Sequence, residues 1–198
     1  MIEDIVFSFN DVKATQAAAF FIKRQGQPSI SYLGLLKMLY ISDRTSLERN
    51  GYPITGDQFV SMKYGPVLTR IYDYVKPQGG RSHSEYWSEY IATVSAPHNP
   101  EKKVFVTLIA DPGDDELSLD EEAIMESVYQ KFGSLNPFDV AEWTHSLPEW
   151  IDPKTLDQKV VNISVINLLH YLKMSDEQIQ RIKAVAERER YLDGVLNG

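Results

Sequence analysis

The sequence predicts an α+β domain that is predominantly α-helical, a compact helical domain with a small antiparallel β-sheet or hairpin. First, the chain has 198 residues, of which 43% are hydrophobic, and this suits one globular domain with a substantial core. Second, most apolar segments follow helical spacing between capping signals. Third, only a few short segments have the β-branched or alternating pattern of strands. We therefore expect residues 1–198 to form a single domain, with a frayed C-terminus over about residues 191–198.

Two helices are expected in the first quarter of the chain. The first covers residues 11–26, and Ser8 or Asn10 is its N-cap. The second covers residues 31–51 and is followed by an extended piece. Because residues 33–40 are apolar over more than one face, we interpret the second helix as the central, buried helix of the domain.

A short strand and a short helix are expected next. Residues 58–62 alternate as a strand does, after a turn at residues 55–57. Gly65 and Pro66 predict the start of a helix, because proline is tolerated at the first helical position. The inner face of this helix is expected to extend to Tyr74.

The middle of the chain is predicted to supply two strands after a polar loop at residues 76–84. The two candidates are residues 86–94 and 103–110, joined by a longer connection at residues 96–101. The second candidate is rich in β-branched residues and has the strongest strand pattern in the chain. A turn at residues 111–114 is expected to follow it.

Four more helices are expected in the C-terminal half. Ser118 and Glu121 form a capping box that begins a helix over residues 119–133. The other three are predicted to begin at Asn136–Pro137, to cover residues 163–172, and to run from Ser175 towards Tyr191.

The net charge of −8 is unevenly distributed. Residues 1–100 contain 10 Lys and Arg against 9 Asp and Glu, whereas residues 101–198 contain 10 against 19. An acidic chain is a poor candidate for non-specific nucleic-acid binding, although the nearly neutral first half leaves room for a local basic patch. Composition therefore leaves three classes open: a small enzyme, a specific DNA binder and a protein-interaction module.

Several kinds of chemistry lack their sequence signatures. The chain has no cysteine, and its four histidines show no metal-ligand spacing. It has no phosphate-binding loop and no nucleophile-elbow motif. No stretch approaches the roughly 20 apolar residues that span a bilayer, and the first residues are acidic rather than basic as in a signal peptide. We therefore expect a cytoplasmic protein that has no metal or nucleotide cofactor and no membrane contact, and an enzyme is the least favoured of the three classes.

Aromatic and acidic clusters are candidates for recognition surfaces. Six of the eleven tyrosines lie around the second predicted helix and the strand after it: Tyr32, Tyr40, Tyr52, Tyr64, Tyr72 and Tyr74. They suit either a core or an interface, and spacing does not separate the two. The acidic stretch at residues 111–126 is either a solvated turn followed by a helix N-terminus or a surface that attracts a basic partner.

Residues 35–75 carry a specific sequence pattern, LLKMLYISDRTSLERNGYPITGDQFVSMKYGPVLTRIYDYV. This pattern resembles the Panacea domain family of SocA-like antitoxins, often labelled phage-associated proteins, in which "LLYladr…G" leads into "pITGDxfxAxxyGPV". The matching positions are Lys37, Leu39, Tyr40, Asp43, Gly51, Pro53, Ile54, Thr55, Gly56, Asp57, Gly65, Pro66 and Val67. Ser61 replaces the usual alanine, a departure that we expect to matter little. Downstream, Thr144, His145 and Trp150 match the "THxxxxW" element of the family.

The resemblance covers roughly the first three quarters of the chain, with its core motif region at residues 31–76. It implies a mainly helical α+β domain that acts as a cytoplasmic antitoxin of a toxin–antitoxin system. Such antitoxins neutralise a cognate toxin, usually encoded nearby, by direct protein contact. A role as an adaptor that delivers the toxin to a AAA+ protease is also associated with the family.

The motif residues have either a structural role or direct contact with the partner. We expect positive φ or close chain approach at Gly51, Gly56 and Gly65. Asp57 is expected to cap backbone amides in its turn, and Asp43 to be paired with Lys63 or a tyrosine hydroxyl. The candidate partner-binding or motif residues are Asp43, Thr55, Gly56, Asp57, Lys63, Tyr64, Gly65, Pro66, Tyr72, His145 and Trp150.

Two alternatives to the antitoxin remain open. A DNA-binding repressor of its own operon would use a basic face near Lys63 and Arg70, but the acidic balance of the chain argues against it. A small enzyme would need Asp43, Asp57 and His145 to converge into an acid–base site.

Overall fold

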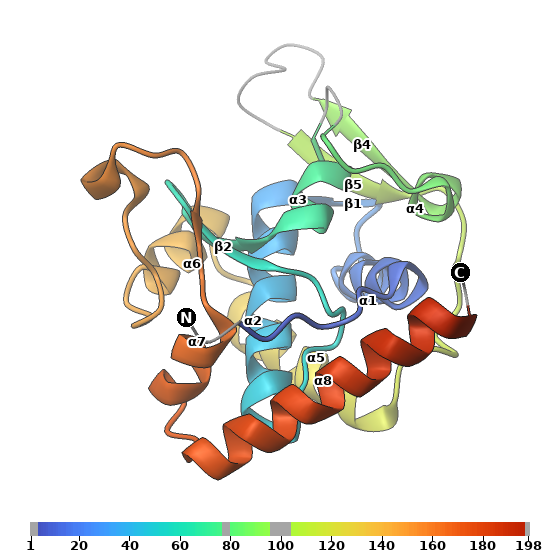
Figure 1. Cartoon of the computed structure of the whole chain (residues 1–198). Coiled ribbons are helices and arrows are strands. Elements are labelled where there is room, and N and C mark those ends of the chain that lie inside the picture. Colours follow the sequence, from blue (N-terminus) through green and yellow to red (C-terminus); the bar gives the residue numbers. More distant parts are fainter. Residues whose placement is uncertain (1–3, 77–79, 96–103, 197–198) are drawn as a thin grey trace.

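The long helix α2 (Tyr32–Asn50) runs through the middle of the molecule (Figure 1). The structure is a computed structural model, and it describes residues 4–76, 80–95 and 104–196. Helices α1 (Asp11–Arg24), α5 (Leu119–Phe132) and α6 (Pro137–Thr144) pack against α2. Twelve residues of α2 are buried, so the prediction of a central, buried helix is confirmed.

Two antiparallel three-stranded sheets flank the helices. The first has the order β1–β5–β4 and consists of β1 (Ser29–Ser31), β5 (Val104–Leu108) and β4 (Ile91–Ser95). The second has the order β3–β2–β6 and consists of β3 (Gly65–Leu68), β2 (Phe59–Met62) and β6 (Val161–Asn162). The predicted α+β class, mainly helical with a small antiparallel sheet, is confirmed.

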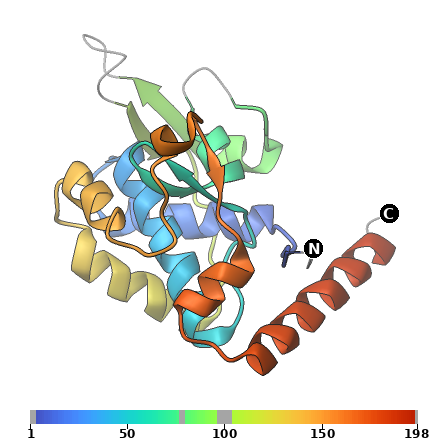
Figure 2. The same ribbon diagram turned by 60° about the vertical axis from the view of Figure 1, so that its left-hand side comes forward.

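The remaining helical elements are α3 (Thr69–Tyr74), α4 (Glu85–Tyr90), the 3₁₀ turn η1 (Pro153–Leu156), α7 (Val165–Tyr171) and α8 (Asp176–Leu196). Figure 2 shows α8 projecting along one side of the body. We expected fraying from about residue 191, but residues 191–196 continue α8. The segment before them is rich in good helix formers and has no proline, so the helix continues.

Local capping signals identified the helix ends well. The Asn10 side chain accepts the backbone N–H of Lys13 at 2.9 Å, and it thereby caps α1. Ser118 and Glu121 form the predicted capping box of α5. Gly51 ends α2 in the left-handed conformation, with φ +79°.

The Gly65–Pro66 pair begins a strand, so our prediction of a helix start there is wrong. β3 pairs with β2 in a hairpin whose two connecting residues are Lys63 and Tyr64. Proline has no N–H to donate to a ladder, and it is tolerated here because β3 is an edge strand of its sheet. The helix begins later, at Thr69.

The predicted strand at residues 86–94 is wrong in its first half, which forms helix α4. The Ser84 hydroxyl oxygen accepts the backbone N–H of Trp87 at 2.8 Å and donates to the Asp11 carboxylate of α1. This N-cap, held by a distant helix, overrides the strand propensity of the aromatic residues. The second predicted strand is confirmed as β5, and the expected connection at residues 96–101 lies outside the described residues.

Candidate functional site

A buried carboxylate on α2 fastens the motif loop to the helix. Asp43 is fully buried, and its two oxygens accept the Thr55 backbone N–H at 3.1 Å and the Thr55 hydroxyl at 2.6 Å. We expected Lys63 or a tyrosine as its partner, but Lys63 is exposed and contacts the Tyr64 ring instead. Loss of hydration on burial raises the pKa of Asp43 to about 7.

A second buried carboxylate in the same loop caps helix α3. One oxygen of Asp57 accepts the backbone N–H of Gln58 at 2.7 Å. The other accepts the N–H groups of Arg70 at 2.8 Å and Ile71 at 3.1 Å. The predicted capping role is confirmed, and it extends beyond the turn to the start of α3. Burial raises the pKa of Asp57 to about 6.

These raised pKa values predict that Asp43 makes the fold less stable as the pH rises from about 4 to about 7. In this window the folded chain binds more protons than the unfolded chain, so the free energy of unfolding falls with increasing pH. Asp43→Asn keeps an oxygen for the Thr55 N–H and removes the titration. Urea unfolding across this window should show the wild-type midpoint falling relative to that of Asp43→Asn. Parallel midpoints would contradict the prediction, since carboxylates elsewhere affect both proteins equally.

Gly56 lies where the motif loop touches the N-terminal segment. Its φ is +73°, and an added Cβ would lie 2.0 Å from the backbone oxygen of Ser8. The adjacent Asn10 N–H donates to the Thr55 carbonyl at 2.9 Å. The expectation of positive φ is confirmed for Gly51, Gly56 and Gly65. Asp43, Thr55, Gly56 and Asp57 therefore form one buried cluster that joins α2, α3 and the N-terminal segment.

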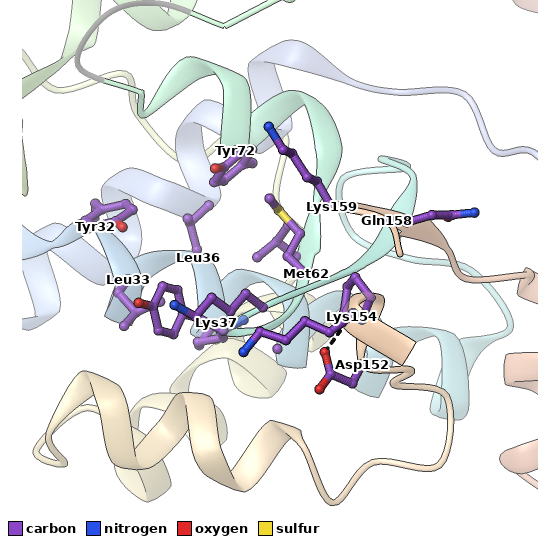
Figure 3. A pocket seen from close by; sticks show the side chains of 15 residues that line it. Tyr32, Leu33, Leu36, Lys37, Met62, Tyr72, Asp152, Lys154, Gln158 and Lys159 are labelled. Atoms are coloured by element: carbon purple, nitrogen blue, oxygen red, sulfur yellow. Dashed lines mark hydrogen bonds between the residues drawn. The ribbon is translucent and has the colours of Figure 1, made fainter. Parts of the chain in front are cut away.

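The other motif residues surround a pocket of about 420 Å³, which we call the hairpin pocket (Figure 3). It lies between α2, the β2–β3 hairpin, α3 and residues 152–159. In Figure 3, Tyr32, Leu36 and Tyr72 line one side, and Lys37, Asp152 and Lys154 line the other. Its remaining lining residues are Leu33, Met62, Lys63, Tyr64, Gly65, Val67, Pro153, Gln158 and Lys159.

Three tyrosines from three elements meet at the hairpin pocket. Tyr32 begins α2, Tyr64 belongs to the hairpin connection, and Tyr72 lies on α3. Burial, together with the neighbouring Tyr72 and Tyr64, raises the pKa of Tyr32. Tyr64 is 47% exposed and contacts the ring of Phe138, which is itself 61% exposed on α6. An exposed aromatic surface therefore adjoins the pocket.

One of the lining residues of the hairpin pocket, Lys37, is a fully buried lysine. The Lys37 ammonium nitrogen donates to the Pro66 carbonyl at 2.7 Å, and no described carboxylate pairs with it. Burial lowers the pKa of Lys37 to about 7. An added Cβ at Gly65 would lie 3.0 Å from this nitrogen and 2.2 Å from the Thr144 hydroxyl oxygen. The Gly65–Pro66 motif thus gives the lysine space and an acceptor.

The rim of the hairpin pocket is basic, although the chain as a whole is acidic. Lys63, Lys154 and Lys159 line it and are exposed, and none of them forms an ion pair with a described residue. Asp152 is the sole acidic residue in the lining, and its carboxylate accepts the Lys154 backbone N–H at 3.0 Å. The pocket therefore combines apolar walls with positive charge that is not neutralised within the described chain.

The downstream motif element, residues 144–150, is attached to strand β2 of the hairpin. His145 stacks on Trp150 with ring centroids 4.0 Å apart, and the Trp150 indole N–H donates to the Met62 carbonyl at 3.1 Å. The hydroxyl of Ser61 accepts the Ile151 N–H at 3.1 Å. The serine that replaces the family's alanine, which we expected to matter little, therefore holds this segment in place.

A third buried carboxylate, Glu149, is one that our sequence reasoning missed. Glu149 is buried, and one of its oxygens accepts the Tyr40 hydroxyl at 2.8 Å and the Arg44 Nε–H at 2.6 Å. Burial raises the pKa of Tyr40 well above its ordinary value, which keeps the hydroxyl protonated as a donor. Glu149 thereby ties the segment after α6 to α2.

The acid–base site considered from the sequence does not assemble. Asp43 and Asp57 bind Thr55 and backbone amides, whereas His145 pairs with Glu142 and stacks on Trp150. Within residues 4–76, 80–95 and 104–196, no group of three or more His, Asp or Glu side chains is placed to hold a metal ion. In the same ranges, no helix is long and apolar enough to cross a membrane.

Comparison with known proteins gave one match. A family model described as "Antitoxin SocA-like, Panacea domain" matches residues 35–151, more than half of the chain. The search of curated proteins and the search of solved structures each returned no match. The matched span includes the buried cluster, the β2–β3 hairpin and the segment fastened to its back. It ends just before residues 152–159, which form one wall of the hairpin pocket.

Proposed function

This chain belongs to the SocA-like Panacea domain family of antitoxins, and we propose that it neutralises a cognate toxin by direct protein–protein binding. The family match, which covers residues 35–151 and so every matching motif position, is the observation that carries this proposal. A non-enzymatic role agrees with the buried motif carboxylates, which bind the chain's own backbone and Thr55. The toxin is expected to be encoded next to this gene.

We propose the hairpin pocket and its aromatic border as the toxin-binding surface. Tyrosine is enriched among the residues that dominate binding energy at interfaces, because it supplies a large contact area and a polar hydroxyl. Tyr64 and Tyr72 both line the pocket, and Phe138 extends the aromatic surface beside Tyr64. Their rigid neighbours support this assignment: β3 is buried, and Lys37 bonds to its Pro66 carbonyl.

Replacing Tyr64 and Tyr72 together by alanine is expected to abolish rescue of cells that express the neighbouring toxin gene. Loss of two interface aromatics should weaken binding by about 2–4 kcal/mol, which is roughly thirty- to a thousand-fold. The assay is growth rescue together with copurification of the toxin, and circular dichroism checks that the variant is folded.

The matched control replaces Tyr52 and Tyr171, which are each 47% exposed and lie outside the hairpin pocket. This control should rescue as the wild type does. A folded Tyr64→Ala, Tyr72→Ala variant that still rescues would contradict the proposed surface. A wild-type protein that never binds the toxin but shifts its own promoter DNA would favour the repressor alternative.

Neutralisation by occlusion and neutralisation by delivery to a AAA+ protease differ in the fate of the toxin. Occlusion leaves the toxin intact in the complex, whereas delivery shortens its half-life. The half-life of the toxin in cells with and without the protease therefore distinguishes the two modes.

A further inference from the structure

We infer that the hairpin pocket binds an acidic toxin segment, in which a large apolar side chain is flanked by carboxylates, and that Lys154 and Lys159 determine this specificity. This inference rests on the proposed function, because it names the chemistry of the segment through which the toxin is bound. It has three supports: the shape and lining of the pocket, its unpaired charges, and the origin of its two walls.

The interior of the pocket suits a large apolar side chain. Leu33 and Val67 are buried in its floor, and Leu36, Met62 and Tyr32 complete the apolar lining. A volume of about 420 Å³ accommodates an aromatic or long aliphatic side chain and part of the segment that carries it. Desolvated apolar contacts of this kind supply most of the binding energy at interfaces.

The positive charges around the pocket favour an anionic partner. Lys63, Lys154 and Lys159 are like charges without ion pairs to described residues, and the buried Lys37 also lines the pocket. Such a cluster is repulsive in the free protein, and carboxylates on the bound segment relieve the repulsion. Among the described lining residues, Asp152 alone is acidic, and it already accepts the Lys154 backbone N–H. A basic segment would meet uncompensated positive charge here.

The two walls of the pocket have different origins. The hairpin and α3 lie within residues 35–151, which match the family, whereas Lys154 and Lys159 lie beyond that span. The segment that carries the two lysines is held firmly: Pro153 is buried, and its carbonyl accepts the Gln158 N–H at 3.0 Å. The pocket thus joins a wall inside the matched span to a wall outside it, and we place selection among partners at the second wall.

A peptide, rather than a nucleic acid, is the partner that these features favour. Nucleic-acid phosphates are bound along extended basic stripes, and the chain as a whole is acidic, with a net charge of −8. Here the lysines surround a concave apolar pocket instead. Duplex DNA would meet the rim and leave the apolar floor unfilled.

The first test uses a fluorescein-labelled heptapeptide with a central tryptophan and three glutamates on each side. Two reference peptides carry lysines in place of the glutamates or alanine in place of the tryptophan. Fluorescence anisotropy with the full chain should show that the acidic tryptophan peptide binds at least about tenfold more tightly than either reference. Equal binding of the lysine peptide, or tighter binding of duplex DNA, would overturn the inference.

The second test reverses the charge of the wall. The double variant Lys154→Glu, Lys159→Glu should weaken binding of the acidic peptide by at least about tenfold. The control Arg181→Glu, Arg188→Glu changes the net charge equally at exposed positions on α8, and it should bind within about twofold of the wild type. Circular dichroism confirms that both variants are folded. Wild-type affinity in the wall variant would overturn the inference.

The same variants in the rescue assay separate this inference from the proposed function. Rescue by the wild type and the control, but not by the wall variant, supports both. Rescue by all three proteins supports the antitoxin function and overturns the assigned role of the two lysines. If the wild type fails to rescue but binds the acidic peptide selectively, the result contradicts neutralisation of the neighbouring toxin and supports the inferred preference of the pocket for acidic segments.

Discussion

Replacing Gly56 by alanine is expected to destabilise the protein by about 3–5 kcal/mol. Two effects combine at this position. The φ of +73° is strained for any residue with a Cβ, and the new methyl would lie 2.0 Å from the Ser8 carbonyl oxygen and 2.7 Å from its carbon. Both atoms belong to backbone that cannot rotate away, so the N-terminal segment must move. Chemical denaturation followed by circular dichroism measures the loss.

Gly26→Ala is the matched control for this variant. Gly26 has a similar φ of +66°, but nothing lies within 4 Å of an added Cβ. Its cost should be limited to the backbone strain, about 1 kcal/mol. The difference between the two variants therefore isolates the contact between the motif loop and Ser8. Equal destabilisation of both variants would show that this contact is unimportant.

Replacing Glu149 by alanine is the second change with a large expected effect, about 3–5 kcal/mol. The substitution leaves the buried Tyr40 hydroxyl without its acceptor, and it leaves the mostly buried Arg44 guanidinium with the half-exposed Glu48 carboxylate, 4.0 Å away, as its remaining ion-pair partner among the described residues. A buried cation that loses its partner is more costly than the original pair was favourable. Because Glu149 precedes Trp150, the stacking of that ring on His145 should also loosen. Denaturant midpoints and the near-ultraviolet circular dichroism of tryptophan measure the two consequences.

Glu142→Ala provides the comparison for this variant. The Glu142 side chain is 81% exposed and pairs with His145 at 3.1 Å. Exposed pairs of this kind contribute about 0–1 kcal/mol, so the variant should unfold almost as the wild type does. If Glu149→Ala were no less stable than Glu142→Ala, the Tyr40–Glu149–Arg44 cluster would not be what holds this segment to α2.

Helices with local signals were predictable from the sequence, and elements that depend on distant partners were not. The caps at Asn10 and Ser118 involve residues within three positions, so their sequence pattern is sufficient. Helix α4 depends on the Ser84 hydroxyl, which is held by Asp11 from another helix. The strand at Gly65 depends on pairing with β2, and the dipeptide Gly–Pro suits a helix start equally well.

In the candidate site, too, local sequence patterns predicted some features, and contacts with distant residues decide the others. The sequence motif identified Asp43 and Tyr64 as candidates but did not predict their burial. In the folded chain Asp43 is fully buried, whereas Tyr64 is exposed and lines the pocket. The sequence shows Lys37 as a single lysine within an apolar helix. Its role is explained only by the structure, in which its ammonium group donates to the Pro66 carbonyl. Lys154 and Lys159 carry no local pattern. They reach the hairpin because Trp150 and Ile151 before them bond to Met62 and Ser61, and because β6 after them pairs with β2, about a hundred residues earlier in the chain.

The pairing of β6 with β2 also sets the order in which the site is completed during synthesis. The β2–β3 hairpin joins strands that are close in sequence, whereas α2 packs mainly against α5 and α6, which are made much later. The wall at residues 152–159 is held to the hairpin at both ends: by Trp150 and Ile151 before it, and by the pairing of residues 161–162 after it. If the hairpin pocket is the toxin-binding surface, as proposed above, a chain that ends before residue 161 lacks the strand that fixes the far end of this wall, and such a truncation should impair rescue.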